Sequence, residues 1–222
     1  MLRLSLALLT LLTFVPTAFA QAKPQKILFI GNSITKHAPK ADIDWHGNWG
    51  MAATSEDKDY VHLVAKALAA KQGATPETMV KNIADFERNH IGYDIAGKFA
   101  DATGFKADLI ILCIGENVPA LKTPEAQAKF QEQVTALLKT LKSNPQAAII
   151  VRSSFWANEA KDTAMRKACE AVGGTFVDIT TLSKNEKNYA RSERSFKFAG
   201  VANHPGDRGM AAIAEAIVKA VK

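Results

Sequence analysis

Residues 108–114 read Asp-Leu-Ile-Ile-Leu-Cys-Ile and give the strongest strand signal in the chain. The run is apolar throughout and does not alternate with polar residues, which indicates a strand covered on both faces, as in a parallel sheet. Shorter apolar runs of the same kind lie on either side of it in the sequence. They predict further strands over 26–30, 78–83, 147–151 and 175–179.

Helical patterns alternate with these strands. They cover 60–71, 93–102 (a short helix), 124–141, 159–172 and, at the end, about 208–221. Pro124 suits the first turn of a helix, and Gly173-Gly174 suits a helix end. Strand–helix alternation predicts an α/β fold in which helices cover both faces of a parallel sheet. Residues 21–222 contain no linker or repeat, so we expect one domain.

The first twenty residues have the pattern of a signal peptide. Arg3 precedes the apolar run 4–15, and Ala18-Phe19-Ala20 provides small residues before a cleavage site at Gln21. The apolar run is too short to span a membrane comfortably. We therefore expect an exported protein, periplasmic or secreted, with no membrane span in the mature chain.

Composition excludes several function classes. The net charge of +6 comes from dispersed lysines without a dense basic cluster, which argues against nucleic-acid binding. Cys113 lies in an apolar strand and Cys169 in a helical pattern, so we expect two buried free thiols. The sequence has no cluster of metal-ligating side chains, so it predicts no metal site.

Residues 34–59 contain no clear helix or strand, although loops of that length in compact domains are usually functional or disordered. The segment holds Trp45, His46 and Trp49, and tryptophans are unusual in disordered segments. We therefore expect a folded loop that faces a ligand.

Three polar sequences follow predicted strands or precede the last helix. They are Gly31-Asn32-Ser33, Gly115-Glu116-Asn117 and Asn203-His204-Pro205. Because ligands bind beyond the carboxyl ends of parallel strands, these residues should meet at one edge of the sheet. A serine needs a base to become a nucleophile, and a histidine can provide it. Backbone N–H groups and an asparagine amide can stabilise an oxyanion.

In these blocks the sequence resembles the SGNH, or GDSL-like, hydrolase family of esterases. The first block is 31–35, where Gly-Asn-Ser replaces the usual Gly-Asp-Ser; the others are 115–117 and His204-Pro205. The resemblance spans 26–222. It implies a three-layer α/β/α sandwich with a five-stranded, flavodoxin-like parallel sheet, and an enzyme that needs no metal or organic cofactor.

The resemblance also implies roles for individual residues. Ser33 would be the nucleophile and His204 the base. The oxyanion hole would consist of the Ser33 N–H, the Asn117 amide and the N–H of Gly50, with Gly47 as the reserve for the weakly marked glycine block.

One position departs from the family pattern. The family commonly has an aspartate three residues before the histidine, and this chain has Val201. Three interpretations are open: a Ser–His dyad with a backbone carbonyl between Gly200 and Ala202 holding the imidazole, a triad completed by Asp178 or Asp207, or a catalytically silent binding protein. We favour the dyad.

The expected substrate is a short-chain acyl ester, with O-acetyl groups on carbohydrate as one class. Trp49, Arg152 and Trp156 are candidate substrate contacts, because aromatic side chains can stack on sugar rings, although they equally often pack in a core. The alternative function is a catalytically silent glycan-binding protein on the same fold.

Overall fold

The computed structural model describes residues 23–221 and contains a five-stranded sheet whose strands all run parallel. The strand order is β2-β1-β3-β4-β5, the flavodoxin-like order. The strands are β1 (Lys26–Gly31), β2 (Glu77–Asn82), β3 (Leu109–Cys113), β4 (Ala148–Arg152) and β5 (Thr175–Val177).

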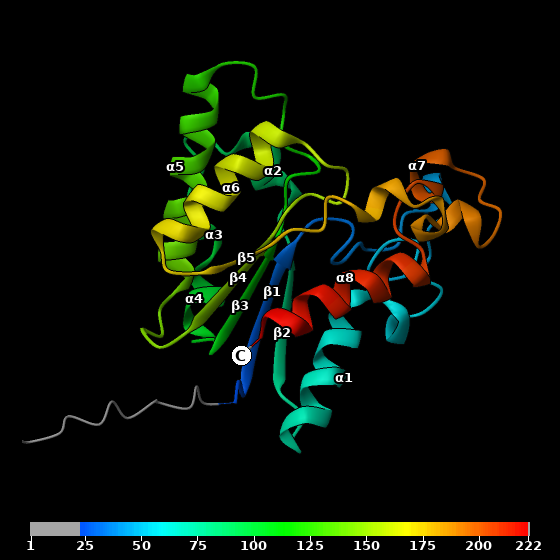
Figure 1. Ribbon diagram of the computed structural model, residues 1–222, viewed down its shortest axis with the longest axis horizontal. Helices are drawn as coiled ribbons and strands as arrows, with labels where there is room; N and C mark the ends of the chain where they lie inside the picture. The colour runs from blue at the N-terminus through cyan, green and yellow to red at the C-terminus, as the bar shows by residue number, and fades with distance from the viewer. Residues whose placement is uncertain (1–22, 222) are drawn as a thin grey trace, which may run out of the picture.

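Helices cover both faces of this sheet (Figure 1). One face carries α3 (Ile95–Lys98), α4 (Ala100–Gly104), α5 (Pro124–Leu141) and α6 (Glu159–Ala171). The other carries α1 (Tyr60–Gln72) and α8 (Asp207–Ala220). The predicted three-layer α/β/α sandwich is confirmed. The short helices α2 (Ala84–Asn89) and α7 (Ala199–Ala202) lie near the carboxyl ends of the strands.

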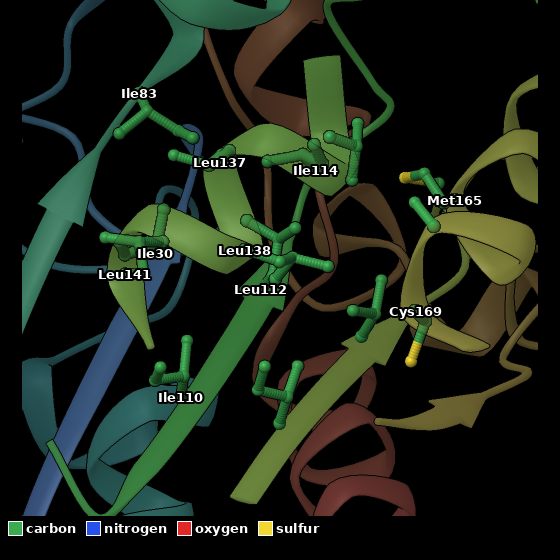
Figure 2. Close-up of a cluster of buried hydrophobic side chains, with 14 of the residues drawn as sticks. Ile30, Ile83, Ile110, Leu112, Ile114, Leu137, Leu138, Leu141, Met165 and Cys169 are labelled. Carbon is green, nitrogen blue, oxygen red and sulfur yellow. The ribbon is translucent and has the colours of Figure 1, made fainter. Parts of the chain in front are cut away.

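The residues of β3 alternate between the two cores, and all five are buried. Ile110 and Leu112 pack beneath α5 and α6 in the cluster shown in Figure 2. Leu109, Ile111 and Cys113 pack on the α1 and α8 side. Successive side chains of a strand point to opposite faces, so a strand between two helical layers must be apolar throughout.

Local sequence signals account for the helix boundaries. The side chains of Asp59, Thr123 and Asn158 accept hydrogen bonds from the first turns of α1, α5 and α6. Gly73 ends α1 in the left-handed conformation, with φ of 76°.

The prediction differs from the structure at short elements. In place of one helix over 93–102 there are two, α3 and α4, with a break at the buried Phe99. The helix α2 was not predicted. The strand β5 ends at Val177 instead of 179, because the Asp178 side chain accepts hydrogen bonds from the backbone and hydroxyl of Thr180 and forms a turn.

Other predictions concern the cysteines, the loop and the ends of the chain. Cys113 and Cys169 are buried and free, on opposite faces of the sheet, as predicted. Residues 34–59 form a folded loop with two 3-10 turns, and Trp45 is only 5% exposed.

The predicted signal peptide lies outside the described residues. Within 23–221, no helix is long and apolar enough to cross a bilayer.

Candidate active site

The carboxyl ends of the three adjacent strands β2, β1 and β3 are level with one another. Gly31 at the end of β1 is paired with Asn82 of β2 and with Cys113 of β3. A Cβ at Gly31 would collide with the Thr35 hydroxyl and the Cys113 carbonyl, so only glycine allows the chain to turn this closely after β1. The turn places Ser33 at the edge of the sheet.

Backbone contacts fix Ser33 from both sides. The Asn32 carbonyl accepts hydrogen bonds from the N–H groups of Thr35 (3.0 Å) and Lys36 (2.9 Å), and the Ser33 carbonyl accepts one from Met51 (2.8 Å). The Ser33 N–H has no acceptor within the described part of the chain. It is therefore free to donate to a ligand.

The ring of His204 faces Ser33. Its Nε2 lies 2.8 Å from Ser33 Oγ, and its Nδ1 lies 2.7 Å from the carbonyl oxygen of Gly200. A carbonyl can only accept, so Nδ1 carries the proton and Nε2 presents its lone pair to the serine hydroxyl. Desolvation of the ring lowers the pKa of His204, although the bond to Gly200 opposes the shift. The imidazole is therefore neutral near pH 7 and can accept a proton.

Short segments around α7 and α8 hold this histidine. It follows α7, and its N–H donates to the Val201 carbonyl over 3.0 Å. Its own carbonyl accepts from Ala190 over 2.9 Å. Trp156 packs edge-on against the ring, with centroids 5.6 Å apart. The ring therefore has a fixed plane as well as a fixed tautomer.

Asn117 lines the same cavity as Ser33, and two neighbours determine the orientation of its amide. Its Nδ2 donates to Glu87 Oε2 (2.8 Å), while its Oδ1 accepts from Arg88 Nη2 (3.0 Å). A flipped amide would oppose donor to donor at Arg88 and acceptor to acceptor at Glu87. The orientation is thus fixed, and the second hydrogen of Nδ2 remains for another acceptor.

Glu87 joins the loops that carry the candidate residues. Its Oε1 also accepts from the backbone N–H groups of Gly115 (2.7 Å) and Asn117 (3.1 Å), and from Asn32 Nδ2 (3.2 Å). Burial, together with the negative charge of Glu116, raises the pKa of Glu87. One carboxylate from α2 therefore links the turn after β1 to the turn after β3.

A second buried carboxylate lies under the same turns. Glu116 accepts from Asn32 Nδ2 (2.6 Å), from the Phe155 N–H (2.7 Å) and from Arg152 Nη1 (2.7 Å). Burial opposes ionisation of Glu116, but the adjacent Arg152 guanidinium and these hydrogen bonds hold its pKa below the ordinary value. This ion pair is buried, and through Glu116 it connects the end of β4 to the turn after β1.

The structure corrects several predicted roles. The Gly50 N–H donates to Asp59 Oδ2 over 2.9 Å, so it is not available to an oxyanion, and Gly50 does not line the cavity that contains Ser33. Arg152 is fully buried against Glu116 and cannot contact substrate.

Neither candidate for a third catalytic residue contacts His204. Asp178 binds Arg166 and Thr180, which lower its pKa, and Asp207 accepts from the backbone and hydroxyl of Thr54. Each of these carboxylates is hydrogen-bonded to groups other than the imidazole.

Two predicted substrate contacts, Trp49 and Trp156, and the reserve oxyanion glycine Gly47 have other partners. Trp49 packs against Trp45 and donates to the Ala53 carbonyl. Gly47 is enclosed by the Trp45 and Trp49 rings. Trp156 contacts His204 as described and supports the base. None of the three lines the cavity that contains Ser33.

A cavity of about 520 Å³ opens over Ser33 and His204. Its apolar wall consists of Ile43, Met51, Phe198 and Val201, and the polar wall includes His37, Lys40, Asn82, Asp85, Arg88 and Asn117. The long loop contributes to both walls, as expected of a ligand-facing segment. The described residues contain no group of three or more side chains suited to hold a metal ion.

Sequence reasoning missed Glu87, Arg88 and the role of Glu116. Glu116 was visible between Gly115 and Asn117, but nothing in the sequence shows that it is buried against an arginine. Glu87 and Arg88 lie on a six-residue helix, too short to give a periodic signal.

Comparison with known proteins identifies the family of the chain. Residues 29–212 match the GDSL-like Lipase/Acylhydrolase family. No curated relative matches the chain.

Several solved structures share the fold at low sequence identity. The lipase/acylhydrolase from Enterococcus faecalis is similar with a TM-score of 0.57 at 15% identity, over 88% of this chain and 94% of that one. A family two carbohydrate esterase from Cellvibrio japonicus gives 0.53 at 18% identity, over 90% of this chain and 61% of that one. A carbohydrate esterase family 3 structure from Talaromyces cellulolyticus gives 0.51 at 16%, over 87% and 94%. The chain therefore belongs to the GDSL-like lipase/acylhydrolase family and is a carboxylic ester hydrolase.

Proposed function

We propose that the enzyme hydrolyses short-chain acyl esters, including O-acetyl groups on carbohydrate, and that Ser33 and His204 act as a catalytic dyad. The observation that carries this proposal is the pair of contacts to His204. Nε2 lies 2.8 Å from the serine hydroxyl, and Nδ1 is held at 2.7 Å by a carbonyl. That geometry matches a general base poised to activate a nucleophile.

The reaction would proceed in two balanced steps. Ser33 Oγ attacks the ester carbonyl while His204 Nε2 takes the hydroxyl proton, and the tetrahedral intermediate collapses as the imidazolium protonates the departing alcohol. A water molecule then attacks the acyl-serine with the same imidazole as base, which releases the acid and restores Ser33. In both steps the negative charge forms on the former carbonyl oxygen.

Two donors are suited to that oxygen. The Ser33 N–H has no acceptor within residues 23–221, and Asn117 Nδ2 has one hydrogen that Glu87 does not use. Such donors act mainly on charge that develops in the transition state, so they raise kcat more than they lower KM.

The cavity and the comparisons favour a small acyl group. The apolar wall of Ile43, Met51 and Phe198 suits a short acyl chain in a cavity of about 520 Å³. Three of the similar structures have titles that name a carbohydrate esterase, and a fourth has a title that names an acetyl esterase. These names describe those proteins, and they motivate the choice of acetylated sugars as test substrates.

One observation favours the alternative of a silent glycan-binding protein: within the described residues, no carboxylate contacts His204 Nδ1. A similar structure is titled "The active site of a carbohydrate esterase displays divergent catalytic and non-catalytic binding functions". Both functions would use the same cavity, so only turnover separates them.

The test is hydrolysis of 4-nitrophenyl acetate together with fluorophosphonate labelling. We expect turnover and a label on the Ser33 peptide by mass spectrometry. Ser33→Ala should lose both, with a fall in kcat on the order of a thousandfold or more. Ser195→Ala, which changes an exposed serine, is the matched control and should keep both. A folded wild-type protein without turnover or label would support the binding function instead.

We also propose that residues 1–20 are removed on export. The support is the charged, apolar and small-residue pattern before Gln21. The intact mass of the protein recovered from the periplasm or medium should correspond to a chain that begins at Gln21. A mass that includes residues 1–20 would refute the proposal.

A further inference from the structure

Two cationic side chains on the cavity wall have no acidic partner. Within residues 23–221, neither Lys40 nor Arg88 forms an ion pair. The neighbouring Lys197 differs, because it pairs with Asp44 over 3.3 Å. Lys40 and Arg88 both line the cavity that contains Ser33. The cavity therefore contains two cations that no carboxylate of the described residues pairs with directly.

The one carboxylate on this wall is already occupied. Asp85 accepts from the Phe86 N–H over 2.9 Å and from the Tyr93 hydroxyl. These bonds hold Asp85 on α2, and its single negative charge against the two cations leaves the lining with a net positive charge.

Arg88 is held against Asn117, the proposed oxyanion donor. Its Nη2 donates to Asn117 Oδ1 over 3.0 Å, and this is its only hydrogen bond within the described residues. The remaining N–H groups of the guanidinium form the planar fork that binds a carboxylate through two parallel bonds. An arginine held against the oxyanion-stabilising amide would place that carboxylate close to the ester bond.

The same cavity also has an apolar lining, which includes Phe198, one of the two large hydrophobic side chains exposed in the described structure, with 46% of its surface accessible. A ligand in this cavity would present an apolar face to Phe198 and an anionic group to Arg88 and Lys40. A neutral ester would leave both cations without a partner.

We infer that the preferred substrate is an ester that carries a carboxylate next to the ester bond, recognised by Arg88 and assisted by Lys40. This inference rests on the proposed function, since it names the substrate class of the same site. The carboxylate can belong to the alcohol side, as in an acylated sugar acid, or to the acyl side, as in a dicarboxylic acid monoester.

The experiment compares kcat/KM for matched esters, with and without the carboxylate. The alcohol-side arm compares two O-acetylated methyl glycosides: that of glucuronic acid, with its carboxylate free, and that of glucose. The acyl-side arm uses mono-4-nitrophenyl succinate against 4-nitrophenyl acetate. In one arm the charged ester should be preferred by about tenfold or more, the scale of one charge-assisted hydrogen bond. That preference should fall as sodium chloride screens the charges.

Variants assign the preference to the two cations. Arg88→Gln should reduce the charged-to-neutral ratio about tenfold and Lys40→Gln about threefold, because the exposed ammonium is the weaker partner. Lys167→Gln removes the same charge from an exposed position on α6 and should leave the ratio unchanged. The ratio isolates charge recognition, because any general loss of activity affects both esters.

Two results would overturn the inference and leave the esterase function intact: a ratio near one in both arms, or a preference that Arg88→Gln does not change. If no ester is hydrolysed, the proposed function fails. The carboxylate preference can then still be tested by measuring the binding of the two methyl glycosides to Ser33→Ala by calorimetry. Methyl glucuronide should then bind at least about tenfold more tightly than methyl glucoside. Equal binding would refute the carboxylate site.

Discussion

Glu87→Gln tests whether the carboxylate on α2 positions the oxyanion-stabilising asparagine. The substitution keeps the length of the side chain and retains one acceptor oxygen. If that oxygen takes the place of Oε1, the bonds from Gly115, Asn117 and Asn32 remain possible. The new amide nitrogen then replaces Oε2 and opposes Asn117 Nδ2, donor against donor, over what is now 2.8 Å.

The magnitude follows from the bonds that are lost. One hydrogen bond to a charged group disappears, and such bonds contribute about 1.5–3 kcal/mol. The Asn117 amide cannot escape by flipping, because its Nδ2 would then oppose Arg88 Nη2. We therefore expect a loss of about 2 kcal/mol in the free energy of unfolding, or about 4–8 °C in Tm for a chain of this size.

The effect on catalysis should be larger in kcat than in KM. Removal of one oxyanion donor costs about a hundredfold in kcat, so a misplaced Asn117 amide should cost between about tenfold and a hundredfold. Thermal unfolding and initial rates with 4-nitrophenyl acetate measure the two effects. Glu170→Gln makes the same chemical change at an exposed position on α6 and should change neither. A Glu87→Gln protein with the expected fall in Tm and a wild-type kcat would refute the positioning role.

Three further predictions concern His204 and the missing acid. Desolvation lowers the pKa of His204, and only the neutral imidazole accepts a proton, so kcat/KM should rise with pH through a midpoint below 6.5 and then level off. A midpoint above 6.5 would contradict the role of His204 as a desolvated base. Asp178→Ala and Asp207→Ala should each leave kcat within about twofold of wild type, and loss of turnover in either folded variant would identify a third catalytic residue. Val201→Asp should lower Tm without raising kcat, because the Val201 side chain is 2% exposed and packs in an apolar cluster, where an unpaired carboxylate is costly. A faster variant of equal Tm would show that the new acid reaches the imidazole.

The strands and most long helices were predictable because their signals are local. The apolar run of β3 could be recognised without knowledge of its neighbours, since a strand covered by helices on both faces has no polar side. The caps at Thr123 and Asn158 act within one helical turn, so they too can be read from sequence. Short elements such as α2 give no such signal, and tertiary contacts decide whether they form.

The site was predictable only as far as it depends on strand ends. Ser33 and Asn117 follow β1 and β3, and topology brings them together whatever the surrounding side chains are. Gly50 failed because the choice among glycines in a long loop depends on hydrogen bonds, and here Asp59, 1% exposed in its side chain, takes the N–H of Gly50. The buried Glu87 could not be predicted, because a glutamate on a short polar segment is ordinarily exposed.

The absence of an aspartate at position 201 has a limited chemical cost in this site. In serine hydrolases, replacing the acid by a neutral amide lowers kcat by about 10⁴ because it favours the wrong imidazole tautomer. The Gly200 carbonyl cannot cause that error, because it has no hydrogen to donate and therefore requires the proton on Nδ1. What it lacks is the charge that stabilises the imidazolium, and buried Glu116 supplies part of it, since its negative charge raises the pKa of His204 against desolvation. Val201 meanwhile packs with Trp45 and holds the loop that lines the cavity. We therefore expect the dyad to be slower than a triad, but by less than the factor of about 10⁴ that the wrong tautomer costs. The orientation of the imidazole should not depend on any other carboxylate.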